Sequence, residues 1–592
     1  MLRVLLVIFS LTLALAACGS PTAQTPTDLP VAASATPAAS VTPAVVANPT
    51  ATPDPRLPTA PPRITPQPTS PPAPLEAGWW DSSVCYEVFV RSFFDSDGDG
   101  IGDLRGLIEK LDYINDGDPN SRTDLGANCI WLMPIAKAAS YHGYDTIDYY
   151  SVDPAYGTND DFKELVRQAE ARGIKIVIDL VLNHTSSEHP WFQEALRDPT
   201  SPYRDWYLWS AIKPPYKGPF GGNEVWHKSP VADEYYYGLF WGGMPDLNYR
   251  NPAVTEEARR ISSFWIDEMG VAGFRLDAIK HLIEYRAVQE DTAETHNWLR
   301  EYRAWLDANH PGTYTIGEIF NAAPDNLAPY YSDQLGYYFA FNLGRGIELA
   351  ANFGDARRYM QEISNYDRLP YQRWAPFLTN HDQNRVMSNL GDDMNKARLA
   401  AIALLTLPGM PYVYYGEEIG MLGLKPDEDL RTPMHWTKEE FGGFTSGIPW
   451  RNPQRDYPIK NVAMQDADPA SLLNTYRKLI HLHIQNPALA NGRFVPLTGG
   501  PSPVAAFLRI ADEEAVLVVI NVGLEPLEAV ALDLASSSLM VGSYSLEPLF
   551  GLPPDAPGTL VIGPGGTTQG FVPLATLPAQ QGFVLRLTPI NP

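Results

Sequence analysis

Cysteine, basic charge and long apolar runs are all scarce in this sequence of 592 residues. Only 3 cysteines are present, and Cys85 and Cys129 lack the spacing of a cysteine-based metal site. Lys plus Arg number 44 against 69 Asp plus Glu, a formal net charge of −25. A phosphate backbone would be repelled, which argues against nucleic acid as a partner. The sequence is 44% hydrophobic and 11% aromatic, which is enough for a large core and more than one domain.

The apolar run near the beginning of the sequence, Val4 to Ala14, is too short to be a spanning helix and is typical of a signal-peptide core. It is followed by Leu15-Ala16-Ala17-Cys18, which resembles a bacterial lipobox. We therefore predict a signal peptide at 1–17, acylation of Cys18 and a chain anchored outside the cytoplasmic membrane. The alternative is an ordinary secretory signal cut near Ala17, which predicts a secreted protein.

Residues 18–76 consist mostly of Pro, Thr, Ala, Ser and Val, as in Pro71-Pro72-Ala73-Pro74. Such a segment cannot bury a core and is expected to be an extended, partly polyproline tether. The other two cysteines, Cys85 and Cys129, each lie inside a predicted strand. In an oxidising compartment they can pair if those strands are neighbours, and otherwise they are buried free thiols.

After the tether, short apolar runs alternate with amphipathic stretches, the pattern of parallel strands covered by helices. Eight strands in this pattern predict an α/β fold, a (β/α)8 TIM barrel. The predicted strands are Val84–Phe93, Ala127–Pro134, Ile174–Leu182, Gly270–Ala278, Tyr314–Phe320, Tyr337–Leu343, Ala375–Thr379 and Pro411–Tyr415, and the predicted helices are Leu104–Ile114, Asp160–Arg172, Pro252–Glu268, Thr292–Asn309 and Ala470–His483.

Two further parts accompany the barrel, which we assign to residues 77–184 and 248–488. The stretch 185–247 after the third strand is rich in Trp and Tyr, and a loop of this length is usually functional. We expect it to be an inserted subdomain that forms one wall of a cleft. From 489 to 592 the pattern changes to short alternating strands with Gly and Pro turns, which predicts a C-terminal β-sandwich.

Polar residues stand where the predicted barrel strands end, and barrel enzymes place their active site at that edge. Arg275 and Asp277 are two residues apart on one strand, so they face the same side, where the guanidinium keeps the carboxylate ionised. Other strand ends carry Asn183 and His184, Glu318, and Asn380-His381-Asp382. Together they place three carboxylates, two histidines and an arginine in one bowl.

Four segments at these strand ends resemble the signature regions of the α-amylase family of glycoside hydrolases, in the family's order. The resemblance extends from about Gly78 to the C-terminus, and the four segments together are highly specific. They are Ile178-Asp179-Leu180-Val181-Leu182-Asn183-His184, Gly273-Phe274-Arg275-Leu276-Asp277, Gly317-Glu318 and Leu378-Thr379-Asn380-His381-Asp382.

The resemblance implies the roles of the carboxylates. Cleavage of an acetal with retention needs one carboxylate as nucleophile and a second, protonated carboxyl as acid. Asp277 matches the family's nucleophile, and Glu318 matches the general acid, which needs a raised pKa. Asp382 matches the third carboxylate, which holds sugar hydroxyls and stabilises the transition state. His184 and His381 match histidines that hydrogen-bond the sugar beside the broken bond.

Further substrate contacts are implied by weaker matches. The segment Tyr141-His142-Gly143-Tyr144-Asp145 resembles one in which the tyrosine, here Tyr144, stacks on the same sugar, with His142 beside it. By spacing alone Tyr144 reads as a core residue. Arg431 resembles an arginine that reaches the same subsite in some relatives, and Lys280-His281 resembles a pair that contacts the sugar on the leaving side.

The loop from Asp95 to Asp103 alternates carboxylates with glycines and suits a hard cation. It lacks the Glu of an EF-hand at the twelfth position, which is Gly106. The loop resembles the calcium loop of bacterial family members, which implies calcium as the cofactor; the alternative is a solvated acidic turn. Asn183 matches a ligand of a second calcium site, whose partners in the insertion the sequence does not identify. The implied loop ligands are Asp95, Asp97, Asp99, the Ile101 carbonyl and Asp103.

The resemblance implies the reaction, but it does not by itself imply which glucan is the substrate. Met244-Pro245-Asp246-Leu247-Asn248 mixes the form of oligo-1,6-glucosidases with that of neopullulanases and cyclomaltodextrinases. We expect a monomeric, membrane-anchored, endo-acting α-amylase, which cleaves internal bonds of starch and maltooligosaccharides. The alternatives are a neopullulanase-like or α-glucosidase-like enzyme, or a glycan-binding lipoprotein without catalysis.

Overall fold

The computed structural model describes residues 78–320, 323–331, 333–370, 373–512 and 514–590. The predicted signal peptide, the acylated Cys18 and the tether lie outside the described residues. Within the described ranges, no helix has both the length and the apolar character needed to cross a bilayer.

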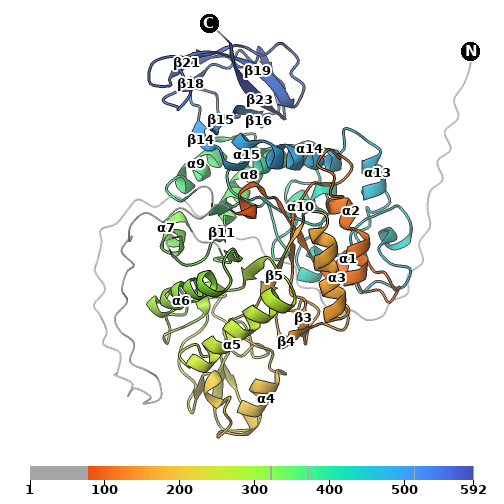
Figure 1. Ribbon diagram of the computed structural model, residues 1–592, viewed down its shortest axis with the longest axis vertical. Coiled ribbons are helices and arrows are strands. Elements are labelled where there is room, and N and C mark those ends of the chain that lie inside the picture. The colour runs from red at the N-terminus through yellow and green to blue at the C-terminus, as the bar shows by residue number, and fades with distance from the viewer. Residues whose placement is uncertain (1–77, 321–322, 332, 371–372, 513, 591–592) are drawn as a thin grey trace, which may run out of the picture. The chain divides into compact units, whose positions relative to one another are not determined.

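The described chain is built around a closed parallel barrel, which confirms the predicted fold class (Figure 1). Its eight strands follow the order β12-β11-β10-β9-β5-β2-β1-β13, and a parallel bridge from Phe377 to Tyr412 joins the two edges. The strands are β1 (Cys85–Val88), β2 (Cys129–Leu132), β5 (Lys175–Leu180), β9 (Gly273–Leu276), β10 (Tyr314–Gly317), β11 (Tyr337–Phe339), β12 (Trp374–Ala375) and β13 (Tyr412–Tyr414).

Helices cover the outside of the barrel. In α3, Thr158 and Asp161 form a capping box, and Phe162, Leu165 and Ala169 recur on one buried face, which is why this segment is helical and packs on the sheet. The α-helices outside the insertion are α1 (Leu104–Glu109), α2 (Leu111–Ile114), α3 (Asn159–Glu170), α5 (Pro252–Ser263), α6 (Ala293–Asn309), α7 (Pro324–Leu327), α8 (Phe341–Phe353), α9 (Arg357–Tyr366), α10 (Val386–Asn389), α11 (Met394–Leu405), α12 (Asp427–Leu430), α13 (Val462–Asp466), α14 (Leu472–Gln485) and α15 (Pro487–Asn491).

The barrel interior changes from apolar to charged along its axis. Cys85, Trp131 and Ile316 belong to an apolar cluster inside the barrel, whereas their strand neighbours pack outward against the helices. Two residues further along its strand, Cys85 is followed by Glu87, which faces the same side. Arg275 on β9 pairs in register with Asp179 on β5, one layer below the strand ends. The barrel therefore places charged side chains directly beneath its C-terminal edge.

All eight barrel strands are shorter than predicted, and two of the predicted segments also change conformation. The predicted strand Tyr337–Leu343 ends at Phe339, and helix α8 begins at Phe341. An apolar run does not distinguish a buried strand from a buried helix, and both segments are buried here. The predicted strand Val84–Phe93 ends at Val88 and continues as a 3-10 turn.

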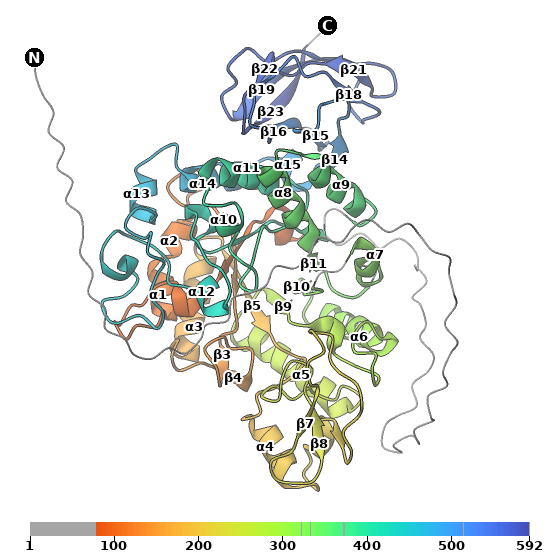
Figure 2. The ribbon, with the colours of Figure 1, turned by 180° about the vertical axis from the view of Figure 1, so that it is seen from behind.

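The segment after β5 forms a small subdomain of its own. It contains α4 (Pro190–Arg197) and a three-stranded sheet of β6 (Trp209–Ser210), β8 (Tyr235–Tyr237) and β7 (Trp226–Lys228). Figure 2 shows α4, β7 and β8 grouped together beyond the hairpin of β3 (Ala136–Ala138) and β4 (Thr146–Val152). Many of its aromatic residues pack on one another, as Trp191 does on Trp206 and Phe192 on Tyr207.

The C-terminal part is all β. A six-stranded sheet in the order β14-β15-β16-β23-β19-β20 packs with the pairs β17-β22 and β18-β21. Along β16, Leu517 and Val519 enter the core of this domain, while Val516 and Val518 join the barrel's hydrophobic cluster, so both faces of the strand are buried. The expected boundary at 489 falls within α15. The strands are β14 (Arg493–Pro496), β15 (Val504–Ile510), β16 (Ala515–Asn521), β17 (Leu527–Glu528), β18 (Leu532–Leu534), β19 (Gly542–Phe550), β20 (Leu560–Ile562), β21 (Thr568–Phe571), β22 (Thr576–Leu577) and β23 (Gln581–Ile590).

Of the two alternatives for Cys85 and Cys129, the structure has the disulfide. The two residues are direct register partners on the neighbouring strands β1 and β2, and both side chains lie in the apolar interior of the barrel.

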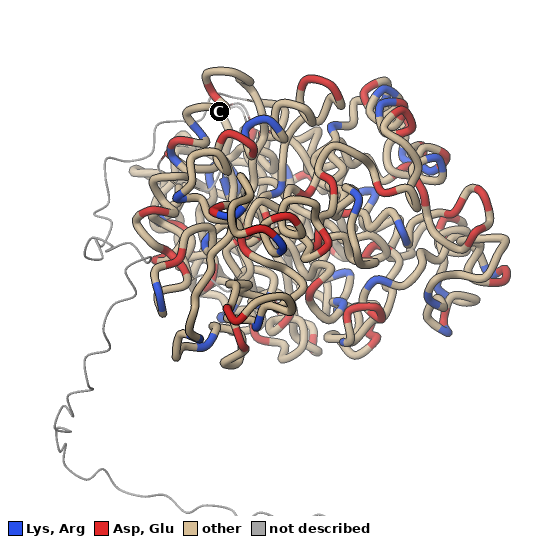
Figure 3. The backbone as a smooth tube through the Cα atoms, turned by 90° about the horizontal axis from the view of Figure 1, so that it is seen from below, with Lys and Arg blue, Asp and Glu red and all other residues tan. Residues whose placement is uncertain are grey.

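Charged residues are spread along the whole described chain, with acidic and basic positions interspersed (Figure 3). Most of the ion pairs have partly exposed partners, and such pairs contribute little to stability. The pair of Arg275 with Asp179 differs, because their side chains are only 1% and 0% exposed. Burial of several charges in one place costs free energy, and this marks the region as a candidate site.

Candidate active site

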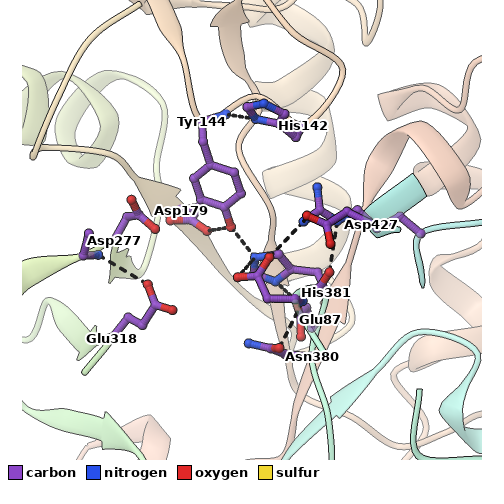
Figure 4. A network of polar contacts seen from close by, with 12 residues as sticks. Glu87, His142, Tyr144, Asp179, Asp277, Glu318, Asn380, His381 and Asp427 are labelled. Atoms are coloured by element: carbon purple, nitrogen blue, oxygen red, sulfur yellow. Dashed lines mark hydrogen bonds and ion pairs between the residues drawn. The ribbon is translucent and has the colours of Figure 1, made fainter. Parts of the chain in front are cut away.

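Arg275 contacts three carboxylates at the C-terminal end of the barrel. Its Nη1 donates to Asp277 Oδ1 at 2.6 Å and to Asp179 Oδ1 at 2.8 Å, and its Nη2 lies 2.7 Å from Glu318 Oε2. Asp277 follows β9 and Glu318 follows β10, so two adjacent parallel strands deliver these carboxylates to one guanidinium. The expected pairing of Arg275 with Asp277 is present. The added contact to Glu318 places the expected nucleophile and acid side by side (Figure 4).

The environment of Glu318 favours its protonated form. Burial raises the pKa of Glu318, the Arg275 guanidinium opposes this, and the charges of Asp277 and Asp382 add to the rise. The backbone of Ala278 adopts a left-handed conformation with φ of 48°, and its N–H points to Glu318 Oε2 at 3.4 Å. A carboxyl that keeps its proton near neutral pH can serve as a general acid.

Asp382 occupies an opposite environment. Arg431 Nη2 lies 2.9 Å from Asp382 Oδ1, and His381 Nε2 lies 3.2 Å from Asp382 Oδ2. Burial alone would raise the pKa of Asp382, but the charges of His381 and Arg431 outweigh it and lower the pKa below its usual range. Asp382 therefore stays ionised. Arg431 also approaches Asp427 at 3.5 Å, which ties α12 to the site.

Tyr144 lies between the charges around Arg275 and the charges around Asp382. Its hydroxyl donates to Asp179 Oδ2 at 2.9 Å and contacts His381 Nε2 at 2.6 Å, and its ring stacks on His381 with centroids 5.6 Å apart. The backbone N–H of Tyr144 donates to His142 Nδ1, and His184 Nε2 contacts the Tyr144 carbonyl at 3.0 Å. The structure thus places His142, Tyr144, His184 and His381 in one connected group.

Lys280 and His281 lie in the 3-10 turn that follows Asp277. Lys280 Nζ pairs with Glu290 at 2.7 Å, and His281 Nδ1 contacts the Gln289 carbonyl at 2.7 Å. The insertion adds Phe220, which is 44% exposed and lies edge-on to His281 with centroids 5.7 Å apart. Each predicted substrate residue is therefore at the C-terminal edge of the barrel, and an aromatic side chain of the insertion joins them.

The loop after β1 brings together three of the expected cation ligands. One carboxylate oxygen from each of Asp95, Asp97 and Asp99 lies within 4.8 Å of the others, a donor set that suits calcium. Asp103 lies outside this group, because its carboxylate accepts hydrogen bonds from the backbone N–H groups of Ser96 and Gly106 and caps α1. Ile101 donates its N–H to Asp99 Oδ1.

Asn183 has partners that the sequence did not identify. Its Nδ2 donates to Asp246 Oδ2 in the insertion at 3.1 Å, and its buried Oδ1 has no hydrogen-bond partner among the described residues. Burial raises the pKa of Asp246 to about 6, and burial together with Asp246 raises that of Glu284. These oxygens, between barrel and insertion, fit a hard cation.

Sequence reasoning missed two buried acids of the site. Glu87 accepts a hydrogen bond from His381 Nδ1 at 2.6 Å, and Asp179 joins Arg275 to Tyr144. Burial raises the pKa of Asp179 to about 7, against the opposing charge of Arg275. Each is a single carboxylate inside an apolar predicted strand, where an ionisable residue is rarely found without a partner. This signal was present in the sequence.

Comparison with known proteins agrees with this geometry. Residues 87–492 match the family model described as alpha amylase, catalytic domain. The chain is 39% identical over 465 residues to alpha-amylase 3 of Dictyoglomus thermophilum, covering 75% of this chain and 85% of the relative. It is 36% identical over 519 residues to the trehalose synthase/amylase TreS of Mycobacterium tuberculosis, covering 78% and 84%. It is 30% identical over 523 residues to an oligo-1,6-glucosidase of Parageobacillus thermoglucosidasius, covering 76% and 91%.

Solved structures show the same relationship. The crystal structure of the alpha-amylase from H. orenii is 40% identical with a TM-score of 0.74, covering 86% of this chain and 99% of that one. The trehalulose synthase MutB of Pseudomonas mesoacidophila is 28% identical with a TM-score of 0.73, covering 86% and 100%. The barrel, the carboxylates at its strand ends and these similarities agree: the chain is an enzyme of the α-amylase family of glycoside hydrolases.

Proposed function

We propose that this enzyme hydrolyses α-1,4-glucosidic bonds within starch and maltooligosaccharides, with retention of configuration. The observation that carries the proposal is the contact of one guanidinium, Arg275, with both Asp277 and Glu318. It places two carboxyl groups on adjacent strands, one held by the guanidinium and the other of raised pKa, and a double displacement requires such a pair.

In the first step, an oxygen of Asp277 attacks the anomeric carbon of the sugar while the bond from that carbon to the leaving oxygen breaks. Glu318 donates its proton to the leaving oxygen, so the shortened glucan departs as an alcohol. Asp382, held ionised beside His381 and Arg431, accepts hydrogen bonds from sugar hydroxyls and stabilises the positive charge that develops on the ring.

In the second step, Glu318 takes a proton from water, and the water oxygen bonds to the anomeric carbon. The bond to Asp277 breaks, and the nucleophile is released as a carboxylate. Two inversions at one carbon leave the configuration unchanged. Tyr144, which is partly exposed and stacks on the buried His381, provides a flat face against the sugar ring.

The leaving side supports an oligomeric substrate. Lys280 and His281 offer polar contacts after the nucleophile, and Phe220 extends this surface with an exposed ring that stacks on Phe240. An aromatic face next to hydrogen-bonding groups suits glucosyl units beyond the bond that is cut. We take this as the reason to favour a polymeric glucan over a disaccharide.

Calcium and an extracytoplasmic location are part of the proposal. The carboxylates of Asp95, Asp97 and Asp99 are the ligands assigned to the loop site, with Asn183 and Asp246 as a second candidate. The disulfide of Cys85 and Cys129 supports folding in an oxidising compartment. The lipid on Cys18 would then tether a monomeric enzyme to the outer face of the membrane.

The deciding experiment is chromatography of the products from amylose, maltotriose, pullulan and maltose, with the wild type and Glu318→Gln in parallel. Early release of mixed maltooligosaccharides from amylose is the expected result. Release of only glucose or maltose from chain ends contradicts the endo mode and favours an α-glucosidase, while rapid cleavage of pullulan favours a neopullulanase.

Several relatives bear the name trehalose synthase, which makes transfer within the site the second candidate. This reaction differs from hydrolysis in its acceptor. The released sugar, instead of water, would attack the glucosyl group bonded to Asp277. Conversion of maltose to trehalose, without release of longer products from amylose, would replace the first proposal by this one.

A further inference from the structure

Glu87 lies in the charged layer beneath the active site and contacts no catalytic carboxylate. It is 2% exposed on β1, and its Oε1 is 2.6 Å from Nδ1 of His381, whose side chain is completely buried. Figure 4 shows Glu87 on one side of the His381 ring and Tyr144 on the other. Glu87 is therefore the carboxylate that contacts Nδ1 of His381, the ring nitrogen on the side away from Tyr144 and Asp382.

The hydrogen bonds around His381 determine its protonation. Tyr144 has a single hydroxyl proton, and it donates that proton to Asp179 Oδ2. Asp179 accepts from Arg275 with both oxygens, at 2.8 and 3.0 Å, and above its pKa of about 7 it is ionised and can only accept from Tyr144. The Tyr144 oxygen is thus the acceptor in its 2.6 Å contact with His381 Nε2, so Nε2 carries a proton. Nδ1 faces a carboxylate and also carries one.

We propose that Glu87 is a positioning residue that keeps His381 an imidazolium, so that His381 orients Tyr144 and Asp382 for the sugar. Without the carboxylate of Glu87, the ring has a neutral form with a lone pair on one nitrogen. A lone pair on Nε2 would face Asp382 Oδ2 at 3.2 Å and the Tyr144 oxygen, and these acceptors would repel it. In that tautomer both contacts that hold the sugar-facing groups would be lost together, whereas a lone pair on Nδ1 would keep the Nε2 proton but remove the positive charge beside Asp382.

The surroundings of His381 agree with a lasting positive charge. Burial alone lowers the pKa of His381, but the carboxylates of Asp382 and Glu87 outweigh it and raise the pKa to about 9. Four groups contact the His381 ring: Glu87 on β1, Trp131 on β2, Tyr144 and Asp382. The charges of Asp179 and Glu318 also interact with it, Arg431 donates to the His381 carbonyl, and Arg275 lies over the rings of Trp131 and Tyr144.

The first experiment measures binding, because the titration of Glu318 would dominate the pH dependence of turnover. Glu318→Gln and the double variant Glu318→Gln/Glu87→Gln are titrated with maltotriose by calorimetry from pH 6 to 10. Above the pKa of Asp179, the single variant should bind evenly until about pH 9, where His381 loses its proton. In the double variant the loss should begin ~1 to 2 pH units lower, and Kd at pH 8 should rise at least ~10-fold.

Matched variants separate positioning from folding. Glu87→Asp in the same background keeps the charge and should restore most of the alkaline binding. Glu418→Gln removes another fully buried carboxylate, one that accepts hydrogen bonds from Tyr86 and Tyr113, and should lower Tm without moving the pH dependence. An equal pH dependence with and without Glu87 would overturn the proposal, and so would failure of Glu87→Asp to restore binding.

This inference rests on the proposed glucan substrate only for its binding test. A second test uses no substrate: 15N-histidine spectra of the full chain, with the His381 signals assigned by His381→Gln. Both ring nitrogens of His381 should stay protonated up to about pH 9 in the wild type and lose a proton at lower pH in Glu87→Gln. Absence of maltotriose binding at every pH would contradict the proposed substrate, whereas a neutral His381 at pH 7 in the wild type would contradict the role of Glu87.

Discussion

The two sides of the active site hold carboxylates in opposite protonation states. On the Arg275 side, one guanidinium meets three carboxylates, so negative charge is in excess and the pKa of Glu318 is raised. On the His381 side, the imidazolium and Arg431 both contact Asp382, and its pKa is lowered. Burial alone would raise both, so the local count of cations decides which carboxyl keeps its proton. Tyr144 joins the two sides through Asp179 and His381.

The largest expected effect on activity is on the Arg275 side of the site, where Glu318 keeps its proton. Glu318→Gln keeps the shape of the side chain but removes the proton donor, and hydrolysis of amylose should fall by roughly 10³ to 10⁴-fold. Initial rates on amylose and on an α-glucosyl fluoride are the measurement, because fluoride leaves without a proton and the first step on that substrate should lose much less. Glu348→Gln, a buried glutamate on α8, is the control and should keep its activity. Equal losses on both substrates would contradict the role of general acid.

The next largest effect is expected from changing Arg275, the cation that holds the three carboxylates of its side of the site. Arg275→Lys keeps one positive charge but cannot reach Asp179, Asp277 and Glu318 at once, because an ammonium is a point charge. We expect kcat to fall by roughly 10³-fold and Tm to fall as well, since removing one partner of a buried ion pair costs about 3 to 5 kcal/mol. Arg509→Lys, at a buried arginine outside the site that donates to the Thr406 carbonyl, should cost stability alone. Turnover within tenfold of the wild type would show that the guanidinium is not needed.

A smaller effect on activity is expected on the His381 side of the site. Arg431→Met removes one of the two cations at Asp382 while His381 remains, so kcat/KM should fall by about 10 to 100-fold. The pKa of Asp382 is depressed in the fold, so the ionised form and its stabilising contribution are lost as pH falls through that pKa. With Arg431 removed, this pKa rises, and the acid limb of kcat/KM should move to higher pH. An unmoved acid limb would mean that another group sets it.

The smallest effect on activity is expected at the loop of Asp95, Asp97 and Asp99, which lies outside both sides. A cation bound only by the folded state stabilises it, by about 2.7 kcal/mol at a hundredfold excess over Kd. Chelator should therefore lower Tm, measured by calorimetry, while the pH dependence of kcat/KM at low temperature stays the same. Asp97→Asn/Asp99→Asn should no longer respond to chelator. A Tm unchanged by excess chelator in the wild type would contradict the cation site.

The local pattern of the sequence predicted much of the fold and the outline of the site. Strands and helices alternate as expected because period and length are local properties, and Arg275 and Asp277 share a face because they are two residues apart on a strand. The ends of elements were less predictable: Phe341 begins a helix where a strand was expected, since both conformations bury the same apolar run.

The sequence by itself determined the order of the strands, the residues at their ends and, through the resemblance, the family's chemistry. Only the tertiary structure decided that Arg275 reaches Glu318 as well as Asp277, that Glu87 supports His381 across 294 positions of sequence, and that one face of β16 packs against the barrel. The reason is physical. A side chain's neighbours along a strand follow from the two-residue repeat, whereas its neighbours across a closed barrel, and hence its charge, depend on register, tilt and burial.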